Sequence, residues 1–283
     1  MTVLEGIQKS AEFLGKKGVE PPRLQAELLL AHVLSLPRMK LYLNFERVLT
    51  PAETDRLREL VRRRGQREPL QHLTGSTSFC GFEIAVNRHV LIPRPETELL
   101  AEAGWNFLST LSPSPSTALD FGTGSGCLAI ALALKAPATQ VCAAEISPDS
   151  LVIARQNAAS HGLAERLRFF QGDGFAALPN ESRFDLIVSN PPYIPAAEIE
   201  TLEPEVRDHD PRGALDGGAD GLEFYRRLAT EAGAFLKPRG KLMLEFGEGQ
   251  APALREILEN QKWVVEAILP DYTRRERIFI ARR

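Results

Sequence analysis

Short apolar segments alternate with helical patterns through most of the chain, from residue 118 to residue 281. The apolar segments are 118–121, 140–145, 168–171, 185–189, 241–246, 264–269 and 277–281. Helical patterns fill most of the gaps, at 127–135, 148–160, 222–236 and 251–260. This alternation predicts an α/β fold with a mainly parallel, seven-stranded sheet covered by helices on both faces. The last two segments follow each other closely, which predicts an antiparallel pair at one edge.

The first 74 residues show no strand pattern. Apolar residues recur there at spacings of three and four, and residues 50–53 (Thr-Pro-Ala-Glu) combine a capping box with a proline at the first helical position. We therefore expect a helical-bundle domain over residues 1–74 and a catalytic domain over 96–283. Apolar alternation over 82–86, a polar turn at 87–89 and an apolar 90–92 predict a β-hairpin within a linker over 75–95.

Charge is divided unevenly between these parts. The whole chain has a formal net charge of −3, but residues 1–74 hold 13 Lys and Arg against 9 Asp and Glu, a net of +4, which leaves −7 on the rest. The excess is concentrated in Arg56, Arg58, Arg62, Arg63, Arg64 and Arg67. These arginines are read either as a solvated helix face with local pairs to Asp55 and Glu59, or as a docking face for an acidic protein or ribosomal RNA. The near-neutral total argues against nucleic-acid binding through bulk charge.

The cysteines and the N-terminal residues indicate in which cellular compartment the protein is expected. Cys80, Cys127 and Cys142 form no CxxC pair, which fits a reducing cytosol and removes the usual cysteine-rich zinc sites. His72 and His89 have no metal-ligand spacing, so we expect structural roles for them and no metal. The polar N-terminus lacks the apolar core of a signal peptide, and the longest apolar run, 127–134, is too short to span ~30 Å of hydrocarbon. We expect a cytoplasmic protein with no membrane partner.

A glycine-rich loop, Asp-Phe-Gly-Thr-Gly-Ser-Gly at 120–126, joins the first strand to the first helix of the alternating region. Glycines at such a junction allow a tight turn and let a ligand approach the amides of the helix N-terminus. Their spacing differs from the GxGxxG of dinucleotide-binding proteins and resembles the S-adenosylmethionine loop of class I methyltransferases. The candidate cofactor residues are Gly122, Thr123, Gly124, Ser125, Gly126, Glu145, Asp173, Gly174 and Asn190.

Two of these candidates have specific expected roles. Glu145 ends the second strand, where a carboxylate can accept both hydroxyls of a ribose from either kind of nucleotide. Asp173 follows the third strand, where it would face the adenine in this architecture; the alternative is an aspartate that only caps its own loop.

The motif Asn190-Pro191-Pro192-Tyr193 directly follows the apolar segment 185–189. Consecutive prolines have a fixed φ and no N–H, so they hold a rigid turn whose carbonyls are free to accept hydrogen bonds. Two acceptors, Asn190 Oδ1 and the Pro191 carbonyl, suit a planar –NH2 group, and Tyr193 offers a flat face to pack against it. We expect these four residues to be catalytic, because holding both N–H bonds of such a nitrogen favours a pyramidal geometry with its lone pair aimed at a sulfonium methyl group.

Together with further motifs, the sequence resembles the release factor glutamine methyltransferases, the PrmC/HemK family. The matching stretches, in order, are 69–75 (Pro-Leu-Gln-His-Leu-Thr-Gly), 90–98, the glycine loop, 189–194, 203–204, 214–218 and 220–222. The resemblance implies a class I S-adenosylmethionine-dependent methyltransferase fold and methyl transfer to the side-chain amide nitrogen (N5) of glutamine. It implies, as substrate, the Gly-Gly-Gln motif of class 1 peptide chain release factors 1 and 2, contacted by the helical domain.

Some positions depart from the family pattern. Glu145 stands where aspartate is usual and can still hold a ribose, and Gly174 stands where relatives place an aromatic residue against adenine, so the adenine wall could involve Phe175. Residues 94–98 either order the domain junction over the cofactor or simply start a helix. The alternative function is an N6-adenine methyltransferase acting on DNA or RNA, because the same motif serves exocyclic amines; the −7 charge of the catalytic part disfavours it, and no direct nucleic-acid substrate is expected.

Overall fold

The computed structural model describes residues 1–111 and 114–283, which divide into two compact units. Residues 1–76 together with 203–209 form the helical unit, and residues 77–202 together with 210–283 form the catalytic unit. The predicted boundary at residue 74 therefore lies within two residues of the observed one. The return of 203–209 to the helical unit is a feature that the sequence analysis does not anticipate.

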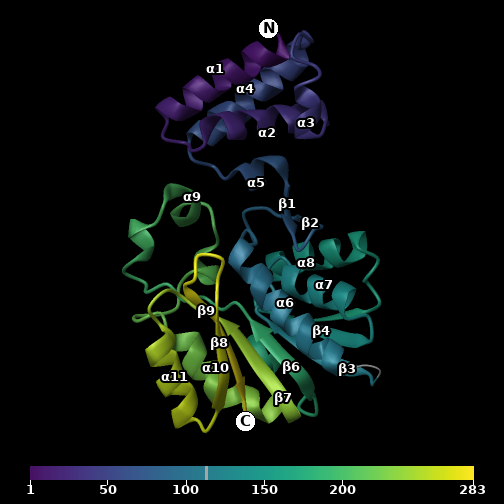
Figure 1. Ribbon diagram of the computed structural model, residues 1–283, viewed down its shortest axis with the longest axis vertical. Helices are drawn as coiled ribbons and strands as arrows, with labels where there is room; N and C mark the ends of the chain where they lie inside the picture. The colour runs from purple at the N-terminus through teal and green to yellow at the C-terminus, as the bar shows by residue number, and fades with distance from the viewer. Residues whose placement is uncertain (112–113) are drawn as a thin grey trace. The chain divides into compact units, whose positions relative to one another are not determined.

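A seven-stranded sheet is the centre of the catalytic unit (Figure 1). Its strands are β3 (Ser116–Phe121), β4 (Thr139–Glu145), β5 (Leu167–Gln171), β6 (Phe184–Ser189), β7 (Leu236–Glu245), β8 (Val264–Pro270) and β9 (Glu276–Arg282), in the order β5-β4-β3-β6-β7-β9-β8. Neighbours from β5 to β7 are parallel, whereas β9 runs antiparallel to both β7 and β8. The sheet, its parallel core and its antiparallel edge are as the sequence predicts.

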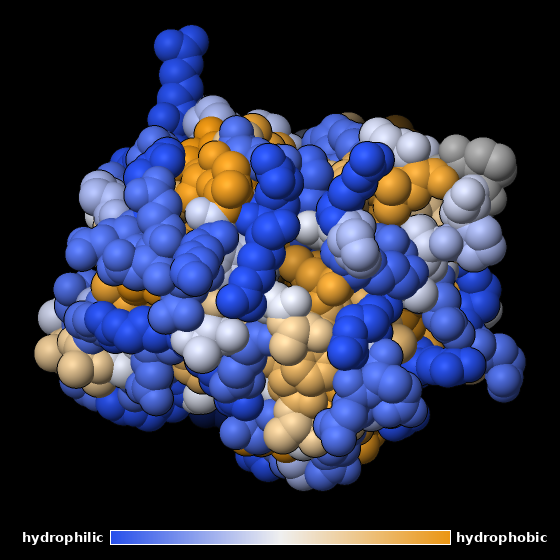
Figure 2. Space-filling view, turned by 90° about the horizontal axis from the view of Figure 1, so that it is seen from below, coloured by the Kyte–Doolittle hydropathy of each residue, from blue (hydrophilic) through white to orange (hydrophobic). Residues whose placement is uncertain are grey.

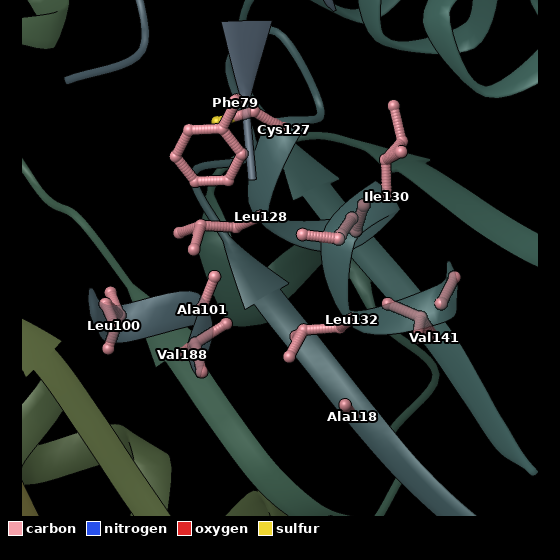
Figure 3. Packing of buried hydrophobic residues seen from close by; sticks show 14 of the residues in the cluster. Phe79, Leu100, Ala101, Ala118, Cys127, Leu128, Ile130, Leu132, Val141 and Val188 are labelled. Atoms are coloured by element: carbon pink, nitrogen blue, oxygen red, sulfur yellow. The ribbon is translucent and has the colours of Figure 1, made fainter. Parts of the chain in front are cut away.

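Helices cover both faces of the sheet (Figure 1). On one face lie α6 (Pro95–Thr110), α7 (Cys127–Lys135) and α8 (Pro148–Ser160); on the other lie α10 (Glu223–Glu231) and α11 (Ala251–Asn260). Figure 3 shows the first core layer, where Leu100 of α6 and Leu128 of α7 gather near Val188 of β6 and Phe79. The second layer is rich in aromatic residues, including Tyr225, Phe246 and Phe279. Burial of these two layers fixes the sheet that carries the site.

The order of the strands places the ligand-binding edge. The chain leaves β3 toward β4 on one side and returns to β6 on the other, so the carboxyl ends of β3, β4 and β6 open onto a topological switch point. In open α/β sheets, ligands bind at such a point. The glycine loop follows β3, Glu145 ends β4 and Asn190 follows β6, so the predicted residues converge there.

Two predicted elements differ from the structure. The hairpin consists of β1 (Ser76–Phe79) and β2 (Phe82–Ala85), which turn at Cys80-Gly81, where both residues have positive φ. Residues 90–92 form no strand; Val90 and Ile92 are instead buried in the first core layer, so their apolar run reflects burial rather than pairing. Because Phe79, Ile84 and Val86 belong to that same layer, the hairpin is part of the catalytic unit and not a separate linker.

The second difference concerns residues 222–236. Helix α10 ends at Glu231, a 3₁₀ turn (Ala232–Phe235) follows, and β7 begins at Leu236 rather than at 241. Gly233 lies within this turn, and glycine lowers the stability of an α-helix there. The sequence pattern alone therefore overextends the helix and delays the strand.

The helical unit consists of α1 (Val3–Lys16), α2 (Pro22–Leu34), α3 (Arg38–Leu41), α4 (Pro51–Gly65), α5 (Leu70–Thr74) and α9 (Pro204–Arg207). The Thr50 hydroxyl accepts from the Glu53 amide and the Glu53 carboxylate accepts from the Thr50 amide, which confirms the predicted capping box. Leu14, Leu29, Leu30 and Leu60 share its apolar core. It is a helical bundle, as expected.

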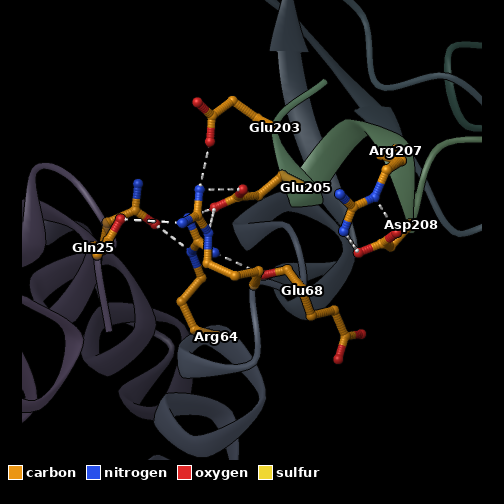
Figure 4. A network of polar contacts seen from close by, with 9 residues as sticks. Gln25, Arg64, Glu68, Glu203, Glu205, Arg207 and Asp208 are labelled. Carbon is orange, nitrogen blue, oxygen red and sulfur yellow. Dashed lines mark hydrogen bonds and ion pairs between the residues drawn. The ribbon is translucent and has the colours of Figure 1, made fainter. Parts of the chain in front are cut away.

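Acidic side chains pair with most of the arginine cluster, and Figure 4 shows the contacts around Arg64. Arg58 pairs with Asp55 and Arg62 with Glu59, as the first reading predicts, and Arg63 pairs with Glu68. Arg64 is only 5% exposed; it donates to Gln25 Oε1 at 3.0 Å and to Glu205 Oε1 at 2.8 Å. Arg67 binds both Glu203 and Glu205. Arg64 thus holds the returning segment in place and is no part of an exposed face.

On the face drawn in Figure 2, apolar side chains form an apolar strip near the middle and several separate areas, all bordered by hydrophilic side chains. Apolar atoms make up a large part of the surface of most folded proteins. Within the described ranges, no helix is both long enough and apolar enough to cross a membrane.

Candidate active site

The glycine loop leaves β3 in a left-handed conformation. Gly122, Gly124 and Gly126 have φ of 75°, 55° and 83°, a region that favours glycine. A side chain at Gly122 or Gly124 would meet no atom within 4 Å, whereas one at Gly126 would lie 3.2 Å from the Cβ of Ala154 in α8. The first two glycines therefore border open space, and the third allows close packing of α8.

Two buried carboxylates hold this loop. Asp120 Oδ2 accepts from the Thr123 hydroxyl at 2.5 Å and from the Ala129 amide at 3.1 Å. Glu145 Oε2 accepts from the Gly124 amide at 2.8 Å, and its Oε1 accepts from the Ser147 amide at 2.9 Å. Each oxygen of Glu145 keeps a further lone pair, so the carboxylate can shape the loop and still accept ribose hydroxyls.

Most of the predicted residues line one pocket. They are Gly122, Thr123, Gly124, Ser125, Glu145, Asp173, Gly174, Asn190, Pro191 and Pro192. Gly126 and Tyr193 do not line it. Gly126 acts through packing. Tyr193 packs against the aromatic core layer, and burial raises its pKa to about 12, so its hydroxyl stays protonated.

The region after β5 differs from one expectation. Asp173 borders the pocket, but its carboxylate forms an ion pair with Arg227, whose Nη2 also donates to the Asp173 carbonyl at 3.0 Å. Phe175 does not wall the pocket: it is 3% exposed and stacks on Phe235 at a centroid distance of 4.8 Å. The side chain after Gly174 therefore belongs to the core, because the 3₁₀ turn (Gly174–Ala177) directs it inward.

Asn190 lies beside β7 because β6 and β7 run in register, with Ser189 opposite Leu244. Its Nδ2 donates to the Thr97 hydroxyl at 3.0 Å. Among the described residues, neither Asn190 Oδ1 nor the Pro191 carbonyl receives a hydrogen bond from the protein. Both oxygens of the predicted clamp are thus available to a ligand in the pocket.

Further residues line the same pocket. Among them are Thr97 and three residues that carry no role in the sequence analysis, Ile146, Phe224 and Arg227. Ile146 is 64% exposed, and such an apolar side chain directly after the strand-ending Glu145 could have been noticed as a wall for a base. Thr97 stands in the 94–98 stretch, which therefore contributes to the pocket. Nothing local in the sequence marks Phe224 or Arg227.

Family models match both parts of the chain. Residues 5–75 match the PrmC N-terminal domain, and residues 101–202 match the methyltransferase small domain. The catalytic unit is similar to a methyltransferase from Pyrococcus furiosus (TM-score 0.51, 23% identity, 72% of this chain and 90% of that chain). It is also similar to the Thermus thermophilus 16S rRNA N2 G1207 methyltransferase solved with AdoMet and guanosine (TM-score 0.50, 22% identity, 74% and 50%). Fold and site together define a class I methyltransferase.

Similarity to curated proteins shows to which family within this class the chain belongs. Release factor glutamine methyltransferases are 46% identical over 250 residues in Geobacter sulfurreducens (88% of this chain, 86% of that protein) and 42% identical over 283 residues in Chlorobaculum tepidum (98% and 95%). The one from Moorella thermoacetica is 42% identical over 285 residues (100% and 99%). The chain belongs to the release factor glutamine methyltransferase family.

Proposed function

We propose that this protein transfers a methyl group from S-adenosylmethionine to the side-chain amide nitrogen of the glutamine in the Gly-Gly-Gln motif of class 1 release factors. One observation carries the proposal: Asn190 Oδ1 and the Pro191 carbonyl border the same pocket as the glycine loop, and the described protein supplies neither with a donor. Family membership supports the same reading.

The pocket fits S-adenosylmethionine. Gly122 and Gly124 border open space where the backbone can approach a ligand, Glu145 keeps lone pairs for the ribose, and Ile146 offers an exposed apolar surface to the base. When bound, S-adenosylmethionine supplies an electrophilic methyl group. No residue need act as a covalent nucleophile: Cys127 also lines the pocket, but burial raises its pKa to about 12 and keeps the thiol neutral.

The substrate nitrogen is the weak partner in this reaction, because its lone pair is delocalised into the amide. Asn190 Oδ1 and the Pro191 carbonyl accept its two N–H bonds, which orients the nitrogen and favours a pyramidal geometry. The nitrogen becomes strongly acidic as it gains the methyl group, so one of its protons passes to water without a dedicated base. The fixed prolines keep the two acceptors from turning away.

We further propose that the helical unit docks the release factor, and that the enzyme acts on release factors 1 and 2 in the cytoplasm. Buried Arg64 is excluded from such a docking face, whereas Arg56 and Arg58 are exposed. Changing both to Glu should raise KM for an intact release factor and leave KM for a short Gly-Gly-Gln peptide unchanged. An equal response of the two substrates would contradict docking at this face.

Mass spectrometry tests the reaction. Purified release factor is incubated with the protein and S-adenosylmethionine, beside an adenine-containing DNA duplex. We expect a shift of about 14 Da mapped to the Gly-Gly-Gln glutamine, lost with Asn190→Ala and kept with Asn180→Ala, which changes an exposed asparagine. Methylated adenine with unmodified release factor would replace the proposal with the nucleic-acid alternative.

A further inference from the structure

A chain of three side chains leads from the pocket into the core of the catalytic unit. Asn190 Nδ2 donates to Thr97 Oγ1 at 3.0 Å, and the Thr97 hydroxyl donates to Glu245 Oε2 at 2.6 Å. Thr97 is 3% exposed and Glu245 is 1% exposed. The three residues come from separate elements: the loop after β6, the first turn of α6 and the end of β7.

The charge state of Glu245 determines which atom donates in each of these hydrogen bonds. An ionised carboxylate can only accept, so the single hydroxyl proton of Thr97 must point to Glu245. The Thr97 oxygen is then left with lone pairs only and must receive the –NH2 end of the Asn190 amide. Asn190 Oδ1 is thereby directed away from Thr97, as the acceptor that an incoming –NH2 group requires.

We propose that Thr97 and Glu245 are positioning residues that hold the Asn190 amide with its oxygen toward the substrate nitrogen. The inference rests on the proposed function, since it assigns a role within the same site. Both residues act through Asn190, and the proposed role requires no contact between them and the substrate. Their effect is to prevent the flipped amide, in which Nδ2 would face the substrate –NH2 group and two donors would meet.

Protonation of Glu245 would remove this preference, because a carboxylic acid can donate to Thr97 and free the hydroxyl proton to face Asn190. Burial raises the pKa of Glu245 to about 7, opposed by the Thr97 hydrogen bond and by the charge of Arg277. The titratable and charged groups around the carboxyl are Glu96 and Arg94 at the start of α6, Arg277 on β9, Tyr193 after β6 and Tyr225 on α10. Arg277 and Arg94 favour the ionised form, and Glu96 opposes it.

Kinetics of the full-length chain test the proposal. Thr97→Val keeps the shape of the side chain but removes the hydroxyl, and it should lower kcat at least about tenfold while KM and S-adenosylmethionine affinity change less than about threefold. Thr97→Ser should restore kcat. In the wild type, kcat should fall as pH drops through about 7, whereas Glu245→Gln should flatten this limb of the profile.

A matched control is Thr139→Val. Thr139 is 4% exposed and shares a 2.7 Å hydrogen bond with Ser116 at the opposite end of the sheet, so the change removes a buried hydroxyl without touching the site. We expect its kcat to match the wild type. If Thr97→Val also matches the wild type, or if it changes only KM, the positioning role is wrong although methyl transfer to release factor stands.

A second readout does not depend on the substrate. With 15N-asparagine labelling, the side-chain amide signals of Asn190, assigned by their loss in Asn190→Asp, should shift with a midpoint near pH 7 in the wild type and stay constant in Glu245→Gln. Signals that ignore pH in the wild type would overturn the inference. If the Asn190 signals shift with pH as expected but release factor is not methylated, the proposed function is wrong and the positioning role of Thr97 and Glu245 stands.

Discussion

The side-chain amide of Asn157 is bonded to both backbone groups of Ala85: Oδ1 accepts from the Ala85 amide at 2.8 Å, and Nδ2 donates to its carbonyl at 3.0 Å. Nδ2 also donates to the Ser125 carbonyl at 2.9 Å. Asn157 is 1% exposed and lies in the last turn of α8. One side chain thus fastens β2 and the glycine loop to the same helix.

Removal of this amide should disturb both attachments. Asn157→Ala leaves buried backbone groups without partners, so we expect a loss of about 2 kcal/mol in the free energy of unfolding. S-adenosylmethionine binding should weaken as well, because the glycine loop loses its tether. Chemical denaturation and isothermal calorimetry measure the two effects. Normal cofactor affinity in Asn157→Ala would mean that the loop is held by Asp120 and Glu145 alone.

Substitution of Gly174 tests the crowding beside the pocket. Gly174 has a φ of 59°, and an added Cβ would lie 2.7 Å from the Phe121 ring. Gly162 has a similar φ of 68° but no atom within 4 Å of an added Cβ. Both alanine variants carry the left-handed strain of about 1 kcal/mol, whereas only Gly174→Ala should add an overpacking cost of about 1–3 kcal/mol. Thermal unfolding compares them, and equal shifts would show that the Phe121 ring yields freely.

The pH dependence of stability should carry a contribution from Asp120. Burial raises its pKa to about 7, against hydrogen bonds from Thr123 and the Ala129 amide. Between about pH 4 and pH 7 the native state keeps a proton that the unfolded state has released, so the free energy of unfolding falls as pH rises.

Asp120→Asn removes this titration and can still accept both hydrogen bonds. The loss of stability from pH 5 to pH 7 should then be smaller by about 2 kcal/mol than in the wild type. Urea unfolding at the two pH values measures it, and identical losses in both proteins would place the titration elsewhere.

Arg64 and Arg62 differ sharply in burial although they are two residues apart on α4. Arg64→Ala would remove the buried guanidinium that joins Gln25 to Glu205 and leave Arg67 as the remaining partner of Glu205, so amides of α4 should exchange with solvent faster by a factor that corresponds to about 2–3 kcal/mol. Arg62→Ala removes only an exposed pair with Glu59 and should leave exchange unchanged. Hydrogen exchange with mass spectrometry reads both, and unchanged protection in Arg64→Ala would contradict its anchoring role.

The sequence predicts the regular parts of this fold well, because they follow from local periodicity. Helices α7, α8 and α11 begin and end at the predicted residues, and the order of strands and helices fixes the edge where the site forms. The 90–92 segment is different: continuous apolar character indicates burial but cannot distinguish a strand from a buried loop.

Within the site, the sequence predicts residues that line the pocket, such as Asn190 and Glu145, but not the hydrogen bond between Thr97 and Glu245 next to it. Asn190 directly follows β6 and Glu145 ends β4, and the carboxyl ends of parallel strands are where such sheets bind ligands. The partnership of Thr97 with Glu245 joins residues 148 positions apart, and no spacing rule connects them. Phe175 shows the converse limit, since whether an aromatic side chain turns inward depends on the 3₁₀ turn that carries it.

The return of residues 203–209 to the helical unit has a consequence for protein engineering. A shortened gene that encodes only residues 1–76 would produce a bundle that lacks Glu203 and Glu205, the acidic partners of Arg64 and Arg67. A chimera that exchanges helical units between two homologues would have to exchange both pieces of chain. The helical unit is therefore encoded by two separate segments of the same gene, and both must be transferred together.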